Sequence, residues 1–132
     1  MVALAGKHHI LRLDEGNNFE IVLQRQKYFT SMTSVNGWRL GTAVIFLKNT
    51  ENGDGVIGFG YFDYVKKYVD MCTDDKIICE KTGNKFLVKL NNLTPIASPM
   101  LVKETAIGNW GINGKMLHGK SLSDKELNTV LH

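Results

Sequence analysis

Two apolar runs separated by a turn-rich segment constrain the fold of this chain most strongly. Residues 42–47 and 56–65 are rich in β-branched and aromatic side chains, which favour strands. Residues 49–55 between them contain asparagine, aspartate and glycine, the residues that dominate tight turns. The pattern therefore predicts an antiparallel hairpin.

The same segment contains the motif G-x-G-x-x-G at Gly53, Gly55 and Gly58. In a dinucleotide-binding turn a helix must begin within this motif, so that its N-terminus can hold the pyrophosphate. Residues 59–65 are aromatic and have no helical spacing, so the motif predicts no nucleotide cofactor. Gly58 and Gly60 instead face the same side of the predicted strand, where a ring or another backbone can come close.

The other elements are predicted from periodicity and turn residues. They are, in order, a strand at residues 8–13, a helix starting near Phe19, an aromatic loop at 28–34, further strands at 76–79 and 85–90, and an irregular segment at 91–115. A capping box at Ser123 and Glu126 begins a final helix. Short turns between strands favour an antiparallel or mixed sheet. We predict one α+β domain over residues 1–132, with about five strands curled into a small sheet or barrel and helices packed outside.

Composition excludes several classes of protein. The chain has 132 residues, of which 43% are hydrophobic and 22% are charged, as in ordinary globular domains. No apolar run is long enough to cross a membrane, and the first residues are too weakly apolar for a signal peptide. We therefore expect a cytoplasmic protein without a membrane partner. The net charge of +3 permits an anionic partner.

The sequence contains no recognisable catalytic or metal-binding motif. Cys72 and Cys79 lack C-x-x-C spacing, and the adjacent His8 and His9 point to opposite faces of a strand. P-loop, G-x-S-x-G and H-E-x-x-H motifs are not present. These observations favour a non-catalytic binding module with no cofactor and no metal.

Two aromatic residues have surroundings unlike those of a core residue. Phe29 is followed by Thr30 and Ser31, and Trp110 lies in a glycine-flanked segment. Flat rings beside small polar groups suit the binding of an unstacked nucleic-acid base, through stacking on its face and hydrogen bonds to its edge.

Four stretches, in this order and spacing, resemble the EVE domains of the PUA-like superfamily and, more remotely, the YTH and ASCH domains. They are "ILRLDEGNNFEIVLQRQKYFTS", "WRLGTAVIFLKN", "GVIGFGYFDYV" and "GNWGINGKMLHGKSLSDKELNTVL". The sequence departs from the family pattern at Thr42, where aspartate is usual, and at Phe29, where readers often have tryptophan.

The resemblance implies recognition of a modified base, such as N6-methyladenine or 5-methylcytosine, flipped or single-stranded in an aromatic pocket. It implies Phe29, with Tyr28 as the alternative, as one wall, and Tyr68 (beside Met71) or Trp110 as the second. Groups for the edge of the base would come from Asp14, Asn17 or Asn18, and Thr30 and Ser31 would also line the pocket. Phosphates would be contacted by Lys66, Lys67, Lys103, Lys115 and Lys120.

The resemblance also implies a biological setting. McrB-type modification-dependent restriction proteins carry such a specificity domain, and further domains or subunits would supply NTPase and nuclease activity. Modified DNA is therefore favoured over RNA as the partner. Three alternatives remain open: a stand-alone RNA-binding protein, an ASCH-like enzyme on modified nucleosides with His118 or Asp14 as acid or base, and a protein-interaction domain using Trp110.

Overall fold

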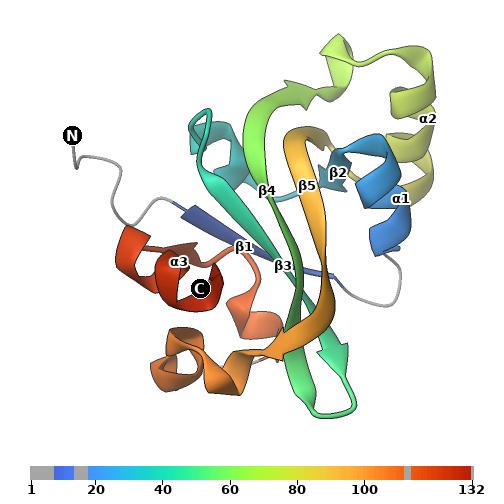
Figure 1. Ribbon diagram of the computed structural model, residues 1–132. Helices are drawn as coiled ribbons and strands as arrows, with labels where there is room; N and C mark the ends of the chain where they lie inside the picture. The colour runs from blue at the N-terminus through green and yellow to red at the C-terminus, as the bar shows by residue number, and fades with distance from the viewer. Residues whose placement is uncertain (1–7, 14–17, 112–113, 132) are drawn as a thin grey trace.

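The chain folds around one six-stranded mixed sheet. The computed structural model describes residues 8–13, 18–111 and 114–131, with the side chains of 106, 109, 114, 115 and 131 not described. The strands have the order β2-β5-β4-β3-β1-β6, and Figure 1 shows helices on both sides of them. The strand bounds are β1 (His8–Leu13), β2 (Lys27–Thr30), β3 (Ala43–Thr50), β4 (Gly53–Lys67), β5 (Phe86–Leu101) and β6 (Ser121–Leu122).

Within the described residues, three α-helices and five 3-10 helices connect and cover these strands. The α-helices are α1 (Phe19–Arg25), α2 (Thr73–Thr82) and α3 (Asp124–Leu131). The 3-10 helices are η2 (Thr33–Gly37), η3 (Tyr68–Asp70), η4 (Val102–Glu104), η5 (Ala106–Trp110) and η6 (Gly114–Leu117). The predicted α+β class is therefore confirmed. The sheet has six strands and remains open, with β2 and β6 at its edges, so the closed-barrel alternative is wrong.

The predicted hairpin is confirmed as the β3–β4 pair. The two strands are antiparallel, with Val44 opposite Gly60 and Phe46 opposite Gly58, while β1 runs parallel to β3. A Cβ added to Gly58 would meet the ring of Phe19 and would lie 2.9 Å from the carbonyl oxygen of Thr94. The prediction that a glycine here lets a ring and a backbone approach is confirmed.

The strand predicted at residues 76–79 is wrong, because this segment belongs to α2. The β-branched pair Ile77 and Ile78 favours a strand locally. The stronger signals are those of a helix, with acidic residues Asp74 and Asp75 in the first turn and Gly83 at the C-cap in the left-handed conformation. Helix α2 lies beside α1 at the right of Figure 1.

Two segments predicted as irregular are strands. Residues 28–30, expected to lie at the start of a loop, belong to the edge strand β2, in which Phe29 pairs with Leu87 of β5. Strand β5 also continues to Leu101 through Pro95 and Pro99. Because β2 pairs only with the first part of β5, these prolines lie where β5 has no second partner strand among the described residues.

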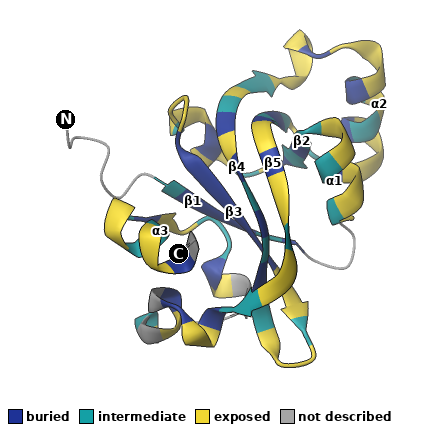
Figure 2. Ribbon diagram, viewed as in Figure 1, coloured by how far each residue is buried: buried dark blue, intermediate teal, exposed yellow. Residues whose placement is uncertain are grey.

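Two hydrophobic clusters lie on opposite faces of the sheet because alternate residues of a strand point in opposite directions. Phe46 packs with α1 and η2 on one face, whereas Ile45 and Leu47 pack with η4, η5, η6 and α3 on the other. Figure 2 shows β1 and β3 as the most buried strands. In the described structure, we find no helix of the length and apolar character needed to span a membrane.

The predicted capping box begins α3. The Ser123 hydroxyl accepts a hydrogen bond from the Glu126 amide at 3.1 Å, and the Glu126 carboxylate accepts one from the Ser123 amide at 2.9 Å. The hydrogen bond from the Ser123 amide holds the pKa of Glu126 below its usual value, although partial burial opposes this shift. A lowered folded-state pKa stabilises the fold above the unfolded pKa, and acidification through the folded-state pKa removes that contribution.

Replacement of Ser123 by alanine should lower the free energy of unfolding by about 1 kcal/mol, because it leaves a helix N–H without its cap. The same change should raise the pKa of Glu126, since the Ser123 hydroxyl also contributes to the lowering. Urea denaturation and an NMR titration of Glu126 measure the two effects. Ser121→Ala, at an exposed serine two residues earlier, is the matched control and should change neither.

Candidate functional site

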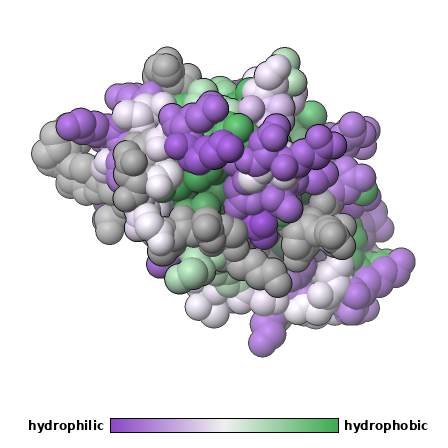
Figure 3. All heavy atoms as spheres, turned by 90° about the horizontal axis from the view of Figure 1, so that it is seen from below, coloured by the Kyte–Doolittle hydropathy of each residue, from purple (hydrophilic) through white to green (hydrophobic). Residues whose placement is uncertain are grey.

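Two cavities are candidates for a binding site. The smaller, of about 210 Å³, lies between α1, β2 and α2. The larger, of about 540 Å³, lies where β1 and β3 end and is lined on its other side by the C-terminal segment, residues 102–117. Figure 3 views the molecule from below and shows hydrophilic side chains around a recessed apolar area. The two cavities have no described lining residue in common.

The smaller pocket brings together three of the predicted base-binding residues, Asn18, Tyr28 and Phe29. Asn18 is the N-cap of α1, where its side-chain oxygen accepts a hydrogen bond from the Glu20 amide at 2.9 Å. This contact fixes the amide group of Asn18 and leaves its NH₂ as a donor. The pocket is completed by Ile21, Val22 and Arg25 of α1, Lys27 of β2, Ile78 and Thr82 of α2, and Asn84.

Strand alternation distinguishes the two aromatic residues of β2. Tyr28 is only 4% exposed, and its ring meets Phe46 edge-on, with ring centroids 6.0 Å apart, in the hydrophobic cluster that packs with α1 and η2 (the main core). Phe29 points to the opposite face and is half-buried against the cluster of Met71, Cys79 and Leu87. Phe29 is therefore the less buried of the two aromatic residues that line the pocket, and it packs against the cluster that contains Met71.

An ion pair ties the two sides of the smaller pocket together. The Lys27 ammonium lies 3.1 Å from the buried carboxylate of Asp75, which links β2 to α2. Arg25 at the end of α1 forms no ion pair with any residue in the described ranges. The pocket therefore has one neutralised cation and one cation with unused hydrogen-bond donors.

The other described candidates make structural contacts outside the smaller pocket. The Thr30 hydroxyl accepts from the Met32 amide at 3.1 Å, and the Ser31 hydroxyl donates to the Gly83 carbonyl at 3.0 Å. Tyr68 donates to the Glu80 carboxylate, and this hydrogen bond raises the Tyr68 pKa. The Ser31 and Tyr68 contacts join the end of β2 and η3 to α2 and its C-cap.

Trp110 holds the C-terminal segment together. Its indole N–H donates to the Glu126 carboxylate at 2.8 Å, and its ring packs against the hydrophobic cluster under α3. Phe29 lies in the separate cluster beside α2. The structure therefore does not bring Trp110 and Phe29 together as two walls of one pocket.

Among the remaining predicted residues, the described lysines do not form one surface. Asp14 and Asn17 lie outside the described residues, as does the side chain of Lys115. Lys66 and Lys67 end β4 opposite the start of β5, whereas Lys103 follows the end of β5. Because β4 and β5 are antiparallel, these lysines lie at opposite ends of the ladder. Lys120 is exposed beside β1, where its carbonyl accepts from the Ile10 amide.

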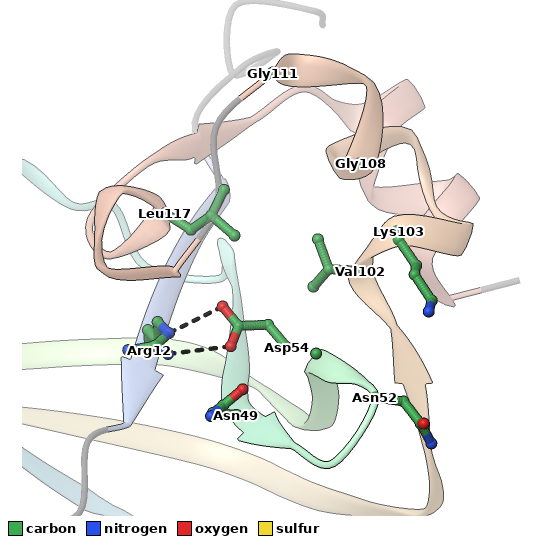
Figure 4. Close-up of a pocket in the computed structure, with 10 residues that line it drawn as sticks. Arg12, Asn49, Asn52, Asp54, Val102, Lys103, Gly108, Gly111 and Leu117 are labelled. Atoms are coloured by element: carbon green, nitrogen blue, oxygen red, sulfur yellow. Dashed lines mark hydrogen bonds and ion pairs between the residues drawn. The ribbon is translucent and has the colours of Figure 1, made fainter.

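The larger cavity contains charged residues that the sequence patterns did not single out. Figure 4 shows the guanidinium of Arg12 paired with the carboxylate of Asp54, with donor–acceptor distances of 2.9 and 3.1 Å. The pair joins β1 to β4. An arginine between the apolar residues Leu11 and Leu13 of a strand requires a partner when it is buried, and this was the available signal. The identity of the partner depends on the three-dimensional fold.

The two cysteines differ in environment, and this difference predicts their reactivity. Cys79 is buried, and that burial raises the pKa of its thiol, with a smaller contribution from the Asp75 carboxylate. Cys72 is exposed. We expect Cys72 to react with a disulfide reagent at pH 8 at least about tenfold faster than Cys79, because only the accessible thiolate attacks. Cys72→Ser retains only Cys79, and Cys79→Ser retains only Cys72. Equal rates of reaction with the reagent for these two variants would contradict the two environments.

Comparison with known proteins adds information on the fold alone. No family model and no curated protein matches the chain. A solved structure described as a hypothetical protein from Leishmania major is similar, with a TM-score of 0.64 and 11% sequence identity. The match covers 95% of this chain and 92% of that one. The architecture therefore occurs in another protein with very different residues.

Proposed function

We propose that this chain is a non-catalytic nucleic-acid-binding module of the EVE type, within the PUA-like superfamily, that takes one modified base into the smaller pocket. The observation that supports this most is the convergence of the Phe29 ring, the Asn18 amide and the Arg25 guanidinium on one pocket. These groups offer a stacking face, a hydrogen bond to the edge of a base and a phosphate contact, respectively.

The size and lining of the pocket fit a single base. Its volume of about 210 Å³ is below the roughly 300 Å³ at which sites for drug-sized ligands begin. Stacking on Phe29 contributes about 1–3 kcal/mol for one base. Ile21 and Ile78 add apolar surface on which a methyl group can rest, so a methylated base gains contacts that an unmodified one lacks.

The polar groups determine how the base is presented. The NH₂ of Asn18, which makes no hydrogen bond with a described residue, donates to a ring nitrogen or a carbonyl at the edge of the base. Arg25, without a described ion-pair partner, contacts the phosphate next to that base. Because extrusion of a paired base costs a few kcal/mol, the module should prefer single-stranded or mismatched sites. We propose modified DNA as the preferred partner, with cleavage supplied by other domains or subunits.

Fluorescence anisotropy tests this proposal. The probes are single strands and matched duplexes that carry adenine, N6-methyladenine, cytosine or 5-methylcytosine. Phe29→Leu removes the stacking face and keeps apolar packing against Met71, Cys79 and Leu87. We expect one modified probe to bind best and to lose about tenfold in affinity in this variant.

Phe59→Leu is the matched control. Phe59 is a half-buried ring on β4 that contacts Tyr61 and does not line the smaller pocket. Its replacement should leave the affinity for every probe unchanged. Binding that is weak, equal for all probes and insensitive to Phe29→Leu would refute the proposed base pocket.

A further inference from the structure

The larger cavity has the dimensions of a small-molecule site. Its volume of about 540 Å³ lies within the range of roughly 300–1,000 Å³ that ligand pockets occupy. Arg12, Asn49 and Asp54 line it from the sheet, and Val102, Lys103 and Leu117 line it from the C-terminal segment. Figure 4 shows Val102 and Leu117 directed into the space above Asp54.

The Arg12–Asp54 pair has hydrogen-bonding capacity left over. The Arg12 and Asp54 side chains are 15% and 8% exposed, and the guanidinium uses Nε and one Nη2 hydrogen in the pair. The rest of its N–H donors find no acceptor in the part of the chain that the structure describes, and each Asp54 oxygen retains a lone pair. The unused N–H donors of Arg12 and the unused lone pairs of Asp54 therefore lie side by side in the cavity, and the bidentate contact fixes their positions.

The surrounding side chains extend this polarity. Lys103 is exposed in η4 and forms no ion pair with a described residue. The side-chain amides of Asn49 and Asn52 make no hydrogen bond within the described ranges. Arg12 and Lys103 supply two positive charges against the one negative charge of Asp54, while Val102 and Leu117 supply an apolar wall. This combination selects for an anionic ligand that also has donors and an apolar face.

We propose that the larger cavity binds a nucleoside monophosphate. The unused donors of Arg12 bind the phosphate, and the charge of Lys103, which Figure 4 shows across the cavity from Arg12, attracts it. Asp54 and Asn49 accept hydrogen bonds from sugar hydroxyls or a base amine, and the base lies against Val102 and Leu117. Inorganic phosphate alone is disfavoured because Asp54 repels it, and a nucleoside alone leaves the charge of Lys103 without a partner. The inference does not rest on the proposed function, since it concerns a different cavity.

Isothermal titration calorimetry on the whole chain tests the inference. The titrants are the four common nucleoside monophosphates, the matching nucleosides, ribose 5-phosphate and inorganic phosphate. At least one monophosphate should bind about tenfold more tightly than its nucleoside, ribose 5-phosphate and phosphate. If no monophosphate exceeds inorganic phosphate, the inference is wrong.

Three variants locate the binding. Lys103→Ala should weaken the monophosphate about tenfold, whereas Lys81→Ala, at an exposed lysine of α2, should leave it unchanged. Asp54→Asn should weaken the monophosphate and strengthen inorganic phosphate, because it removes the repelling carboxylate. Equal effects of Lys103→Ala and Lys81→Ala would overturn the inference. Loss of monophosphate binding in Phe29→Leu would do so too, because it would place the ligand in the smaller pocket.

Discussion

Gly58→Ala should lower the free energy of unfolding by about 3 kcal/mol, because the added methyl group has no space. It would collide with the ring of Phe19 and with the Thr94 carbonyl, which is backbone and cannot rotate away. Phe19 begins α1 and packs against Phe46, so its displacement disturbs the main core as well. Urea denaturation followed by circular dichroism measures the loss.

Gly37→Ala provides the control for this effect. A Cβ at Gly37 meets no heavy atom within 4 Å, and the residue has no positive φ angle. Its replacement should change stability by less than about 0.5 kcal/mol. If Gly58→Ala were as stable as Gly37→Ala, this result would contradict the tight packing of Phe19 and β5 against Gly58 of β4.

Arg12→Ala should lower the free energy of unfolding by about 3 kcal/mol, because it leaves the almost completely buried Asp54 carboxylate without its cation. The double variant Arg12→Ala/Asp54→Ala should be more stable than Arg12→Ala alone, since it removes the unpaired charge as well. A gain in stability on the second substitution distinguishes the loss of a charge pair from a simple loss of packing.

Arg39→Ala is the matched control for Arg12→Ala. Arg39 is exposed, and its side chain forms no ion pair with a described residue. The free energy of unfolding of Arg39→Ala should lie within about 0.5 kcal/mol of that of the wild type. A double variant less stable than Arg12→Ala would contradict the role given to the pair.

Local sequence signals predicted the elements in which propensity, turn chemistry and capping agree. The β3–β4 hairpin, the helix at Phe19 and the capping box of α3 belong to this group. The segment around Ile77 and Ile78 carries conflicting signals, and the helix caps outweigh the β-branched pair. Strand β2 could not be recognised because its stability comes from pairing with β5, which is remote in sequence.

The residues of the candidate site were likewise predictable only where local sequence signals indicate them. Asn18 and Phe29 come from one continuous stretch, and family resemblance and local chemistry indicated both. The opposite wall, with Ile78 and Thr82, was missed because it belongs to α2. Arg12 and Asp54 are far apart in sequence, so their pairing depends on the arrangement of β1, β3 and β4.

The most direct test of the central claim is an NMR titration of the isotopically labelled chain with the best-binding modified single strand and its unmodified counterpart. We predict chemical-shift changes at Asn18, Phe29 and Thr82 that are larger with the modified strand. These changes should disappear in Phe29→Leu and persist in Phe59→Leu. Shifts confined to exposed lysines, with no difference between the two strands, would contradict a base-reading pocket between α1 and α2.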